Sequence, residues 1–381
     1  MKFFKFILIF TFIISTILLY LPFKVQGSVS VSASSAILME QQSGRILYAK
    51  DAHVKKRIAS ITKIMTAILA IESGKLDETV KVSEQAVRAE GSSIYLKLGE
   101  KIKLEDLVYG LMLRSGNDSA VAIAEHVGGS LDGFVFLMNQ KAEEIGMENT
   151  HFANPHGLDD HENHLSTAYD MAILTQYAML NDTYQKIAGT KVHRVPDPTG
   201  DWDRVWSNKN RLLTGLYEYT TGGKTGYTKR AKRTLVTTAS KDNLELIAVT
   251  LNGPDDWDDH INMYEYGFRN YELVTVLKEG IIKKVDDEYY KKKVYVDQDV
   301  LYPVTDKERE LFHIEITLQK PKEEWRNKKL EPDIVGKAII SLDQKPIRTV
   351  PLYYKQSFKK ENDSFFDSFK NMLSIHLGVR E

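Results

Sequence analysis

The chain has 381 residues, a formal net charge of −1 at pH 7 and no cysteine. This length exceeds that of one typical domain, so two domains are expected. The balanced charge gives no reason to expect a nucleic-acid partner. A chain without cysteine cannot use thiol catalysis, disulfides or cysteine-ligated metals.

The first residues have the pattern of an export signal. Two lysines precede an apolar run at residues 6–21, and Pro22 and the small residue Gly27 follow it. This pattern predicts a signal peptide over residues 1–27. An uncleaved membrane anchor is the alternative, because the apolar run is only slightly shorter than a spanning helix. In both cases we expect the folded part of the protein outside the cytoplasm.

A serine and a lysine three positions apart open the first long helix. Residues 35–40 and 45–49 predict a hairpin, and the helix after it carries Ser60 at its N-terminus. Its apolar positions share one face, namely Ile61, Ile64, Met65, Ile68 and Leu69. Ser60 and Lys63 should therefore meet, and a lysine with a lowered pKa could take the proton of the serine hydroxyl. An N-cap serine followed by a solvated lysine is the alternative.

A second candidate motif lies between two helices. Residues 104–113 and 119–127 both have helical periodicity, and the tripeptide Ser115-Gly116-Asn117 separates them. A tight turn here can present a hydroxyl and a carboxamide side by side in a cleft. The alternative is structural, with Gly116 as the C-cap of the first helix and Asn117 as the N-cap of the second.

A loop with four histidines follows the next predicted helix, which covers residues 130–145. The loop spans residues 151–164 and lacks the His-Glu-x-x-His spacing of a zinc helix, so we expect an ordered polar loop rather than a catalytic metal site. We expect His156 to border the cleft, as we do Ser93 from the loop-rich segment 74–104.

The third candidate motif is the tripeptide Lys-Thr-Gly at residues 224–226. Residues 181–219 before it show little periodicity and predict an irregular connection, whereas residues 234–240 and 244–252 after it predict two antiparallel strands. The motif should lie on or beside that sheet, where a glycine lets another backbone or a ligand approach closely. It is not a phosphate loop, because it lacks the Gly-x-x-x-x-Gly that such a loop places before its lysine.

The amino-acid composition of the chain changes after a predicted helix at residues 258–271. The part that follows is rich in Lys and Glu and predicts short alternating strands at residues 293–296, 313–318, 336–342 and 348–354. These strands predict a small β domain. Because no catalytic constellation occurs in it, we expect a spacer or partner-binding role.

The chain closes with a predicted amphipathic helix. Its apolar stripe consists of Phe365, Phe366, Phe369, Met372, Leu373 and Leu377. The helix could pack on its own β domain, or it could lie in the membrane interface with its aromatic face buried. We favour the membrane interface, because the stripe is terminal and follows a polar linker.

The three motifs occur in the order Ser-x-x-Lys, Ser-x-Asn and Lys-Thr-Gly, which is the penicilloyl-serine signature. From about residue 35 to residue 271 the sequence resembles the serine D,D-carboxypeptidases of peptidoglycan, the low-molecular-mass penicillin-binding proteins, and it resembles them more loosely over the β domain. Residues 154–164 and the tail look most like the sporulation, or spore-cortex, carboxypeptidase of endospore-forming bacteria.

The resemblance implies an α/β fold of the penicillin-binding and serine β-lactamase type. In this fold an antiparallel sheet with helices meets an all-helical lobe, and the active site lies in the groove between them. The implied organisation is a catalytic domain over residues 28–272, a C-terminal β domain over residues 273–357 and an amphipathic membrane-anchor tail over residues 358–381.

The resemblance also implies three catalytic residues. Ser60 would be acylated by the carbonyl of the penultimate D-alanine, with Lys63 as proton acceptor. Ser115 would relay a proton toward the leaving D-alanine. Two lysines near one serine repel each other, so Lys224 would help to keep Lys63 neutral enough to act as a base.

A substrate-binding set follows from the same resemblance. Asn117 would hold the substrate amide, Lys224 would attract the substrate carboxylate, and Thr225 would contact it. Gly226 completes the third motif. The main-chain N–H of Tyr227 would form the oxyanion hole together with that of the nucleophile.

These expectations describe an exported D,D-carboxypeptidase that trims peptidoglycan pentapeptides, is acylated by β-lactams and needs no cofactor or metal. Its expected place is the outer face of the cytoplasmic membrane or the spore envelope, with the tail on the membrane surface. The alternatives are a β-lactamase or D,D-transpeptidase using the same serine, although no residue matches the deacylating glutamate of class A β-lactamases, and a catalytically dead penicillin-binding scaffold. The acidic segment 253–259 stands where some relatives carry a basic residue, so the partner of the substrate carboxylate stays open.

Overall fold

The computed structural model describes residues 29–196, 203–283, 285, 287–321, 325 and 334–354. The chain divides into two units, residues 1–30 and residues 31–381, and nearly all described residues belong to the second. The expected signal peptide at residues 1–27 and the expected tail helix at residues 358–381 lie outside the described residues.

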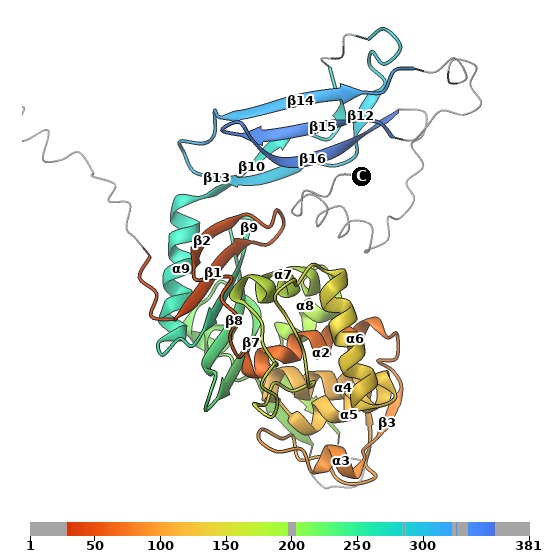
Figure 1. The fold of residues 1–381 in the computed structure, drawn as a ribbon, viewed down its shortest axis with the longest axis vertical. Coiled ribbons are helices and arrows are strands. Elements are labelled where there is room, and N and C mark those ends of the chain that lie inside the picture. The colour runs from red at the N-terminus through yellow and green to blue at the C-terminus, as the bar shows by residue number, and fades with distance from the viewer. Residues whose placement is uncertain are drawn as a thin grey trace, which may run out of the picture. The chain divides into compact units, whose positions relative to one another are not determined.

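A five-stranded antiparallel sheet carries the third motif (Figure 1). Its order is β2-β1-β9-β8-β7, so strands from the start of the described chain pair with strands some 200 residues later. The strands are β1 (Ser35–Glu40), β2 (Ile46–Lys50), β7 (Thr220–Thr228), β8 (Lys232–Lys241) and β9 (Leu244–Leu251). Both predicted hairpins are confirmed. Because β7 is an edge strand, one side of its backbone is available to an extended ligand.

The two faces of this sheet are covered by different helices. On one face, Ile37 and Met39 belong to the main hydrophobic core, which includes α7 (Ala168–Ala178). On the other face, Leu38 lies against Gly267 of α9 (Asp256–Asn270). Successive residues of β1 thus face opposite layers, as the side-chain period of a strand requires.

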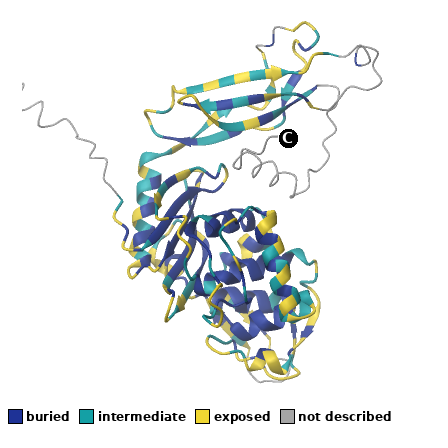
Figure 2. Ribbon diagram, in the orientation of Figure 1, coloured by how far each residue is buried: buried dark blue, intermediate teal, exposed yellow. Residues whose placement is uncertain are grey.

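The helical lobe is built around α2 (Lys63–Glu72), which is buried at every position from Lys63 to Ile71 (Figure 2). A single turn of 3-10 helix, η1 (Ala59–Thr62), leads into it. Its other elements are β3 (Thr79–Lys81), α3 (Glu84–Val87), β4 (Lys101–Lys103), α4 (Leu104–Tyr109), the π-helix η2 (Gly110–Arg114), α5 (Asn117–Gly128) and α6 (Leu131–Glu144). A helix that is buried on all sides is a core helix, so α2 fixes the nucleophile motif to the centre of the lobe.

The expectation of an irregular connection over residues 181–219 is wrong. Asn181 caps a short helix, α8 (Asp182–Ala188), by accepting a hydrogen bond from the Tyr184 N–H. After it, β5 (Val192–Val195) pairs with β6 (Arg204–Ser207), and a short π-helix, η3 (Leu212–Leu216), follows. Elements of four to seven residues are too short to produce a periodic signal in a window of about 11–18 residues.

The C-terminal residues contain a second hydrophobic core, separate from that of the helical lobe. Its five-stranded antiparallel sheet has the order β11-β12-β16-β15-β14, and β10 pairs with β13. The strands are β10 (Glu272–Leu277), β11 (Gly280–Ile281), β12 (Val294–Val296), β13 (Val300–Val304), β14 (Phe312–Leu318), β15 (Ile334–Leu342) and β16 (Lys345–Tyr354). The four predicted strands correspond to β12, β14, β15 and β16. Strand β13 was missed because it contains Pro303, which weakens a strand signal.

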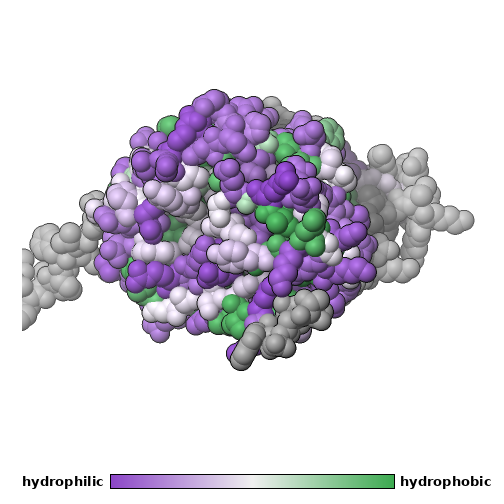
Figure 3. Space-filling view, turned by 90° about the horizontal axis from the view of Figure 1, so that it is seen from below, coloured by the Kyte–Doolittle hydropathy of each residue, from purple (hydrophilic) through white to green (hydrophobic). Residues whose placement is uncertain are grey.

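One face of the protein is mainly polar. Figure 3 shows one face on which hydrophilic residues predominate and apolar residues form small separate groups. Single exposed apolar side chains such as Tyr95, Leu98 and Phe136 are usual on protein surfaces. Within the described ranges no single helix is long and apolar enough to cross a membrane. Helices α5 and α6 meet these criteria only when they are taken together, and the pair is bent by 83°.

Candidate active site

The Lys63 amine contacts the Ser60 hydroxyl at the start of α2. Ser60 lies in η1 and Lys63 is the first residue of α2, and Lys63 Nζ lies 3.1 Å from Ser60 Oγ. The same Nζ donates to Asn117 Oδ1 at 2.7 Å and to the His156 carbonyl at 2.6 Å. A neutral amine has two N–H donors and one lone pair. With both donors engaged by these acceptors, the lone pair faces the Ser60 hydroxyl.

Burial is the main reason why the Lys63 amine can be neutral. Burial, followed by the charges of Lys224 and Lys209, lowers the pKa of Lys63 well below its usual value of 10.5, against an opposing effect of Asp118. Burial and then the Lys209 charge also lower the pKa of Lys224, to about 7. Since Lys63 is the amine in contact with Ser60, it can accept the hydroxyl proton.

The histidine loop, residues 151–164, holds the turn that leads to Ser60. Ala59 has a left-handed φ of 49°, and its carbonyl accepts a hydrogen bond from Thr62 Oγ1 at 2.8 Å. The Ala153 N–H donates to His164 Nδ1, which leaves the proton of Nε2 to be donated to Thr62 Oγ1, 2.8 Å away. Burial is the main cause that lowers the pKa of His164 to about 3, so the ring is neutral at pH 7.

The two residues expected at the cleft border, His156 and Ser93, make hydrogen bonds within the protein. The His156 ring accepts a hydrogen bond from the Leu158 N–H at Nδ1, and Ser93 Oγ donates to Asp118 Oδ2 at 2.5 Å. The neighbouring Ser92 lines the pocket. In the part of the chain that the structure describes, no group of three His, Asp or Glu side chains is arranged to hold a metal ion.

The second motif presents Ser115 through an unusual backbone conformation. Ser115 ends the π-helix η2 with a left-handed φ of 65°, and Gly116 precedes α5 with a φ of −59°. The interpretation of Gly116 as the left-handed C-cap is therefore wrong, because the serine itself takes that position. Gly116 is needed for space, since a Cβ there would lie 2.8 Å from Asp118 Oδ1. Lys224 Nζ donates to Ser115 Oγ at 3.0 Å.

Asn117 is buried behind these groups and only 2% exposed. Its Oδ1 accepts the hydrogen bond from Lys63, and its Nδ2 donates to the Glu90 carbonyl at 2.5 Å. Both ends of the carboxamide are thus engaged. In this arrangement Asn117 orients Lys63, and its second N–H and the second lone pair of Oδ1 are not used by these two hydrogen bonds.

The third motif places edge strand β7 directly beside the nucleophile. Lys224 is fully buried and also donates to the Thr225 carbonyl at 2.8 Å. A Cβ on Gly226 would lie 2.9 Å from Ser60 N and 2.4 Å from Thr234 Oγ1. The close backbone approach that the sequence predicted for this glycine therefore occurs, and the approaching backbone is that of Ser60.

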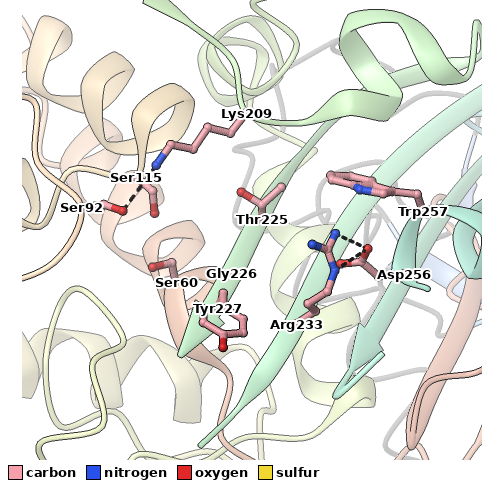
Figure 4. Close-up of a pocket in the computed structure, with 10 residues that line it drawn as sticks. All are labelled: Ser60, Ser92, Ser115, Lys209, Thr225, Gly226, Tyr227, Arg233, Asp256 and Trp257. Carbon is pink, nitrogen blue, oxygen red and sulfur yellow. Dashed lines mark hydrogen bonds and ion pairs between the residues drawn. The ribbon is translucent and has the colours of Figure 1, made fainter. Parts of the chain in front are cut away.

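Residues of all three motifs open onto one pocket of about 310 Å³, which Figure 4 shows in close-up. Its lining consists of Ser60, Ser92, Ser115, Lys209, Thr225, Gly226, Tyr227, Arg233, Asp256 and Trp257. The predicted residues Lys63, Asn117 and Lys224 are buried behind this lining. A hydroxyl beside an amine of lowered pKa, with a second hydroxyl paired with another amine, is an arrangement that can support acyl transfer through a serine ester.

Sequence reasoning missed two cationic residues of the pocket lining, Lys209 and Arg233. Lys209 comes from the segment expected to be irregular, and its Nζ donates to Ser92 Oγ at 3.3 Å. No local pattern marks it. Arg233 lies opposite Tyr227 in the β7–β8 pairing, so a register between the third motif and the strand predicted at residues 234–240 could have found it.

Comparisons with known proteins agree with this geometry. Residues 23–255 match a family described as D-alanyl-D-alanine carboxypeptidase, and residues 271–360 match the C-terminal domain of penicillin-binding protein 5. D-alanyl-D-alanine carboxypeptidase DacF of Bacillus subtilis is 37% identical over 257 residues, which cover 65% of this chain and 65% of that protein. The match thus spans slightly less than two thirds of that relative.

Two matches from Haemophilus influenzae extend over longer stretches. D-alanyl-D-alanine carboxypeptidase DacA is 30% identical over 348 residues, which cover 84% of each chain. The crystal structure of penicillin binding protein 5 has a TM-score of 0.70 and 27% sequence identity, and the match covers 86% of this chain and 98% of that one. These matches confirm the expected α/β penicillin-binding fold with a C-terminal β domain. Because the family match takes in more than half of the chain, this protein belongs to the D-alanyl-D-alanine carboxypeptidase family.

Proposed function

We propose that this protein is a serine D,D-carboxypeptidase that removes the terminal D-alanine from peptidoglycan stem pentapeptides and is acylated by β-lactams. The observation that carries the proposal is the 3.1 Å contact between the buried Lys63 amine and the Ser60 hydroxyl, in a chain of this family. A serine hydroxyl becomes an effective nucleophile when an adjacent base takes its proton.

In the first step Ser60 Oγ attacks the carbonyl carbon of the penultimate D-alanine, and its proton passes to Lys63 Nζ. The carbonyl oxygen becomes an oxyanion. The main-chain N–H of Ser60 is available to it, because the first N–H groups of a helix have no partner within that helix. We assign the N–H of Tyr227 on β7 as the second donor.

The peptide C–N bond then breaks, and the leaving D-alanine amine must gain a proton. Ser115 can give its proton to the amine, and Lys224, which donates to Ser115 Oγ, can replace it. The proton held by Lys63 then passes to Lys224, so that the net transfer moves the proton of Ser60 to the leaving amine. Lys63 is then neutral again and can deprotonate the water that hydrolyses the ester, returning that proton to Ser60.

Incubation with a pentapeptide ending in D-Ala-D-Ala, with and without an acceptor amine, tests this proposal. We expect free D-alanine and the tetrapeptide in equal amounts under both conditions, and no product from Ser60→Ala. A dominant transfer product would instead identify a D,D-transpeptidase. Rapid turnover of a penicillin without release of D-alanine would identify a β-lactamase.

We further propose that residues 1–27 direct export and that the tail at residues 358–381 attaches the protein to the outer face of the cytoplasmic membrane. The β domain at residues 273–357 then acts as a spacer between the membrane and the catalytic domain at residues 28–272. The resemblance of residues 154–164 to the spore-cortex enzyme supports a role in cortex maturation. Muropeptide analysis of spores from a deletion strain tests that role, and an unchanged cortex would contradict it.

A further inference from the structure

Three segments of the chain meet beside the nucleophile. They are the residues that lead into η1, the histidine loop, and β7 with the turn that follows it at residues 229–231. A Cβ on Gly226 of β7 would lie 2.9 Å from Ser60 N, and a Cβ on Gly157 of the histidine loop would lie 1.9 Å from the Ala59 carbonyl oxygen. The backbones of β7 and of the loop thus approach the nucleophile turn closely.

One carboxylate of the histidine loop joins the other two segments. Glu162 Oε1 and Oε2 accept hydrogen bonds from Arg230 Nη1 and Nη2 at 2.6 and 2.7 Å. Glu162 Oε2 also accepts one from Arg57 Nη2 at 2.7 Å. Since Arg230 follows β7 and Arg57 precedes η1, Glu162 ties the end of the edge strand to the chain that enters the nucleophile turn.

Further contacts support the same junction. The main-chain N–H of Arg230 donates to Asp159 Oδ2 at 3.3 Å. Arg57 Nη1 donates to the His161 carbonyl at 3.0 Å and lies 3.7 Å from Asp159 Oδ1. A single exposed ion pair contributes little, but a bidentate arginine and a network of charges can hold a fixed geometry. We call this network the ionic clamp; its members are Arg57, Asp159, Glu162 and Arg230.

The ionic clamp lies outside the pocket lining but close in sequence to the assigned oxyanion donors. Arg57 precedes Ser60 by three residues, and Arg230 follows Tyr227 by three residues. Ser60 and Tyr227 line the pocket from η1 and from β7 (Figure 4). The two N–H groups that must point at one oxygen therefore belong to different segments, and the ionic clamp joins these segments.

The pairing of β7 with β8 cannot by itself fix the distance between β7 and η1. β7 is an edge strand, and its pairing partner β8 lies on the side away from the ligand. A bond from Thr234 Oγ1 of β8 to the Ile58 carbonyl, 2.9 Å long, ties the sheet to the nucleophile turn from within the protein. The ionic clamp supplies a second tie at the end of β7 itself.

We infer that the ionic clamp positions the oxyanion hole, with Arg57, Glu162 and Arg230 as positioning residues that fix the separation of the Ser60 and Tyr227 N–H groups. This inference rests on the proposed function. Oxyanion donors act when they lie about 2.7–3.1 Å from the charged oxygen, and a misplacement of about 1 Å can cost about 100-fold in rate. Opening the ionic clamp should therefore slow acylation and leave the first, non-covalent binding of the ligand almost unchanged.

Salt can loosen the ionic clamp without a substitution. The hydrogen bonds from Arg230 are the main cause that holds the pKa of Glu162 at about 2, so its carboxylate is charged in any ordinary assay buffer. The side chains of Glu162 and Arg230 are 81% and 48% exposed. Dissolved ions therefore reach this pair and screen its attraction.

Rapid-mixing kinetics with a penicillin test the inference, because they separate the dissociation constant of the first complex from the acylation rate constant. We expect Glu162→Gln and Arg230→Gln each to lower the acylation rate constant about 5- to 30-fold, less than the loss of a whole oxyanion donor, and to change the dissociation constant by less than about 2-fold. The double variant should be no slower than the slower single variant, because both substitutions remove the same contact.

A matched control and a salt series complete the experiment. Lys229→Gln removes an exposed charge from the same turn, outside the ionic clamp, and should keep the wild-type rate constant. At saturating penicillin, raising the salt from about 0.05 M to about 1 M should lower the wild-type rate constant toward that of Glu162→Gln, and it should leave Glu162→Gln nearly unchanged.

Several results would overturn the inference. They are a wild-type acylation rate constant in a folded Glu162→Gln protein, a loss confined to the dissociation constant, an equal loss in Lys229→Gln, and losses that multiply in the double variant. A wild-type protein that is not acylated and releases no D-alanine would refute the proposed function, and the inference would fall with it. The two failures are distinguishable, because the second is read from the wild type alone.

Discussion

Gly157 is the point at which the histidine loop touches the nucleophile turn, and replacing it with alanine tests how tightly that turn is held. Gly157 has a φ of +87°, and a Cβ there would lie 1.9 Å from the Ala59 carbonyl oxygen and 2.4 Å from its carbon. These are backbone atoms and cannot rotate away. Since Ser60 follows Ala59 directly, Gly157→Ala must displace either the loop or the nucleophile.

The expected magnitude follows from two costs. A left-handed φ costs an alanine about 1–2 kcal/mol, and overpacking of a filled site costs about 1–3 kcal/mol more. We therefore expect Gly157→Ala to lose about 2–5 kcal/mol of unfolding free energy. A shift of the nucleophile by about 1 Å should also slow acylation about 100-fold.

The assay is the rate of acylation by a fluorescent penicillin, measured on protein whose folding is checked by thermal unfolding. Gly129→Ala is the matched control, because Gly129 has a similar φ of +73° and nothing lies within 4 Å of its added Cβ. Gly129→Ala should lose only the free energy that a left-handed φ costs an alanine, and a penicillin should acylate it at the wild-type rate. A Gly157→Ala protein with the stability of Gly129→Ala and the acylation rate of the wild type would refute the reasoning.

Three further outcomes are expected. Lys63→Arg keeps a cation but cannot supply a neutral amine, so the acylation rate should fall by at least about 100-fold; a wild-type rate would exclude Lys63 as the base. Lys224 has a folded-state pKa of about 7 against the usual 10.5, so the unfolded state binds more protons between these values and the free energy of unfolding should rise with pH there. Urea unfolding at about pH 7.5 and 9.5 should show a smaller rise in the free energy of unfolding for Lys224→Met than for the wild type. An equal rise would contradict the lowered pKa of Lys224. Removal of residues 361–381 should release the signal-cleaved protein from membranes in active form, which sedimentation checks; a truncated protein that stays in the membrane fraction would show that the tail is not the anchor.

The sequence alone predicted the positions of groups that lie close together along the chain. Ser60 and Lys63 meet because one helical turn separates them, and the apolar stretch around Lys63 already indicated a lowered pKa. The strands next to the third motif were found because two strand-like runs flank the turn residues Lys241, Asp242 and Asn243. The order of the three motifs then indicated the family and, through it, the fold.

Other features depend on contacts that no local pattern encodes. Lys209 reaches the pocket only because its main-chain N–H is bonded to the Leu113 carbonyl, far away in the sequence. Ser115, and not the adjacent glycine, takes the left-handed position at the end of the π-helix. The hydroxyl of Ser93 faces Asp118, and only the loop path decides that Ser92 lines the pocket.

The central claim is that Ser60 forms the acyl-enzyme, and intact-protein and peptide mass spectrometry after brief treatment with a penicillin tests it most directly. The account predicts one added penicilloyl mass per chain, located on the peptide that contains Ser60 and absent from a folded Ser60→Ala variant. A penicilloyl group that persists in Ser60→Ala, or that maps to another residue of the wild-type protein, would contradict it.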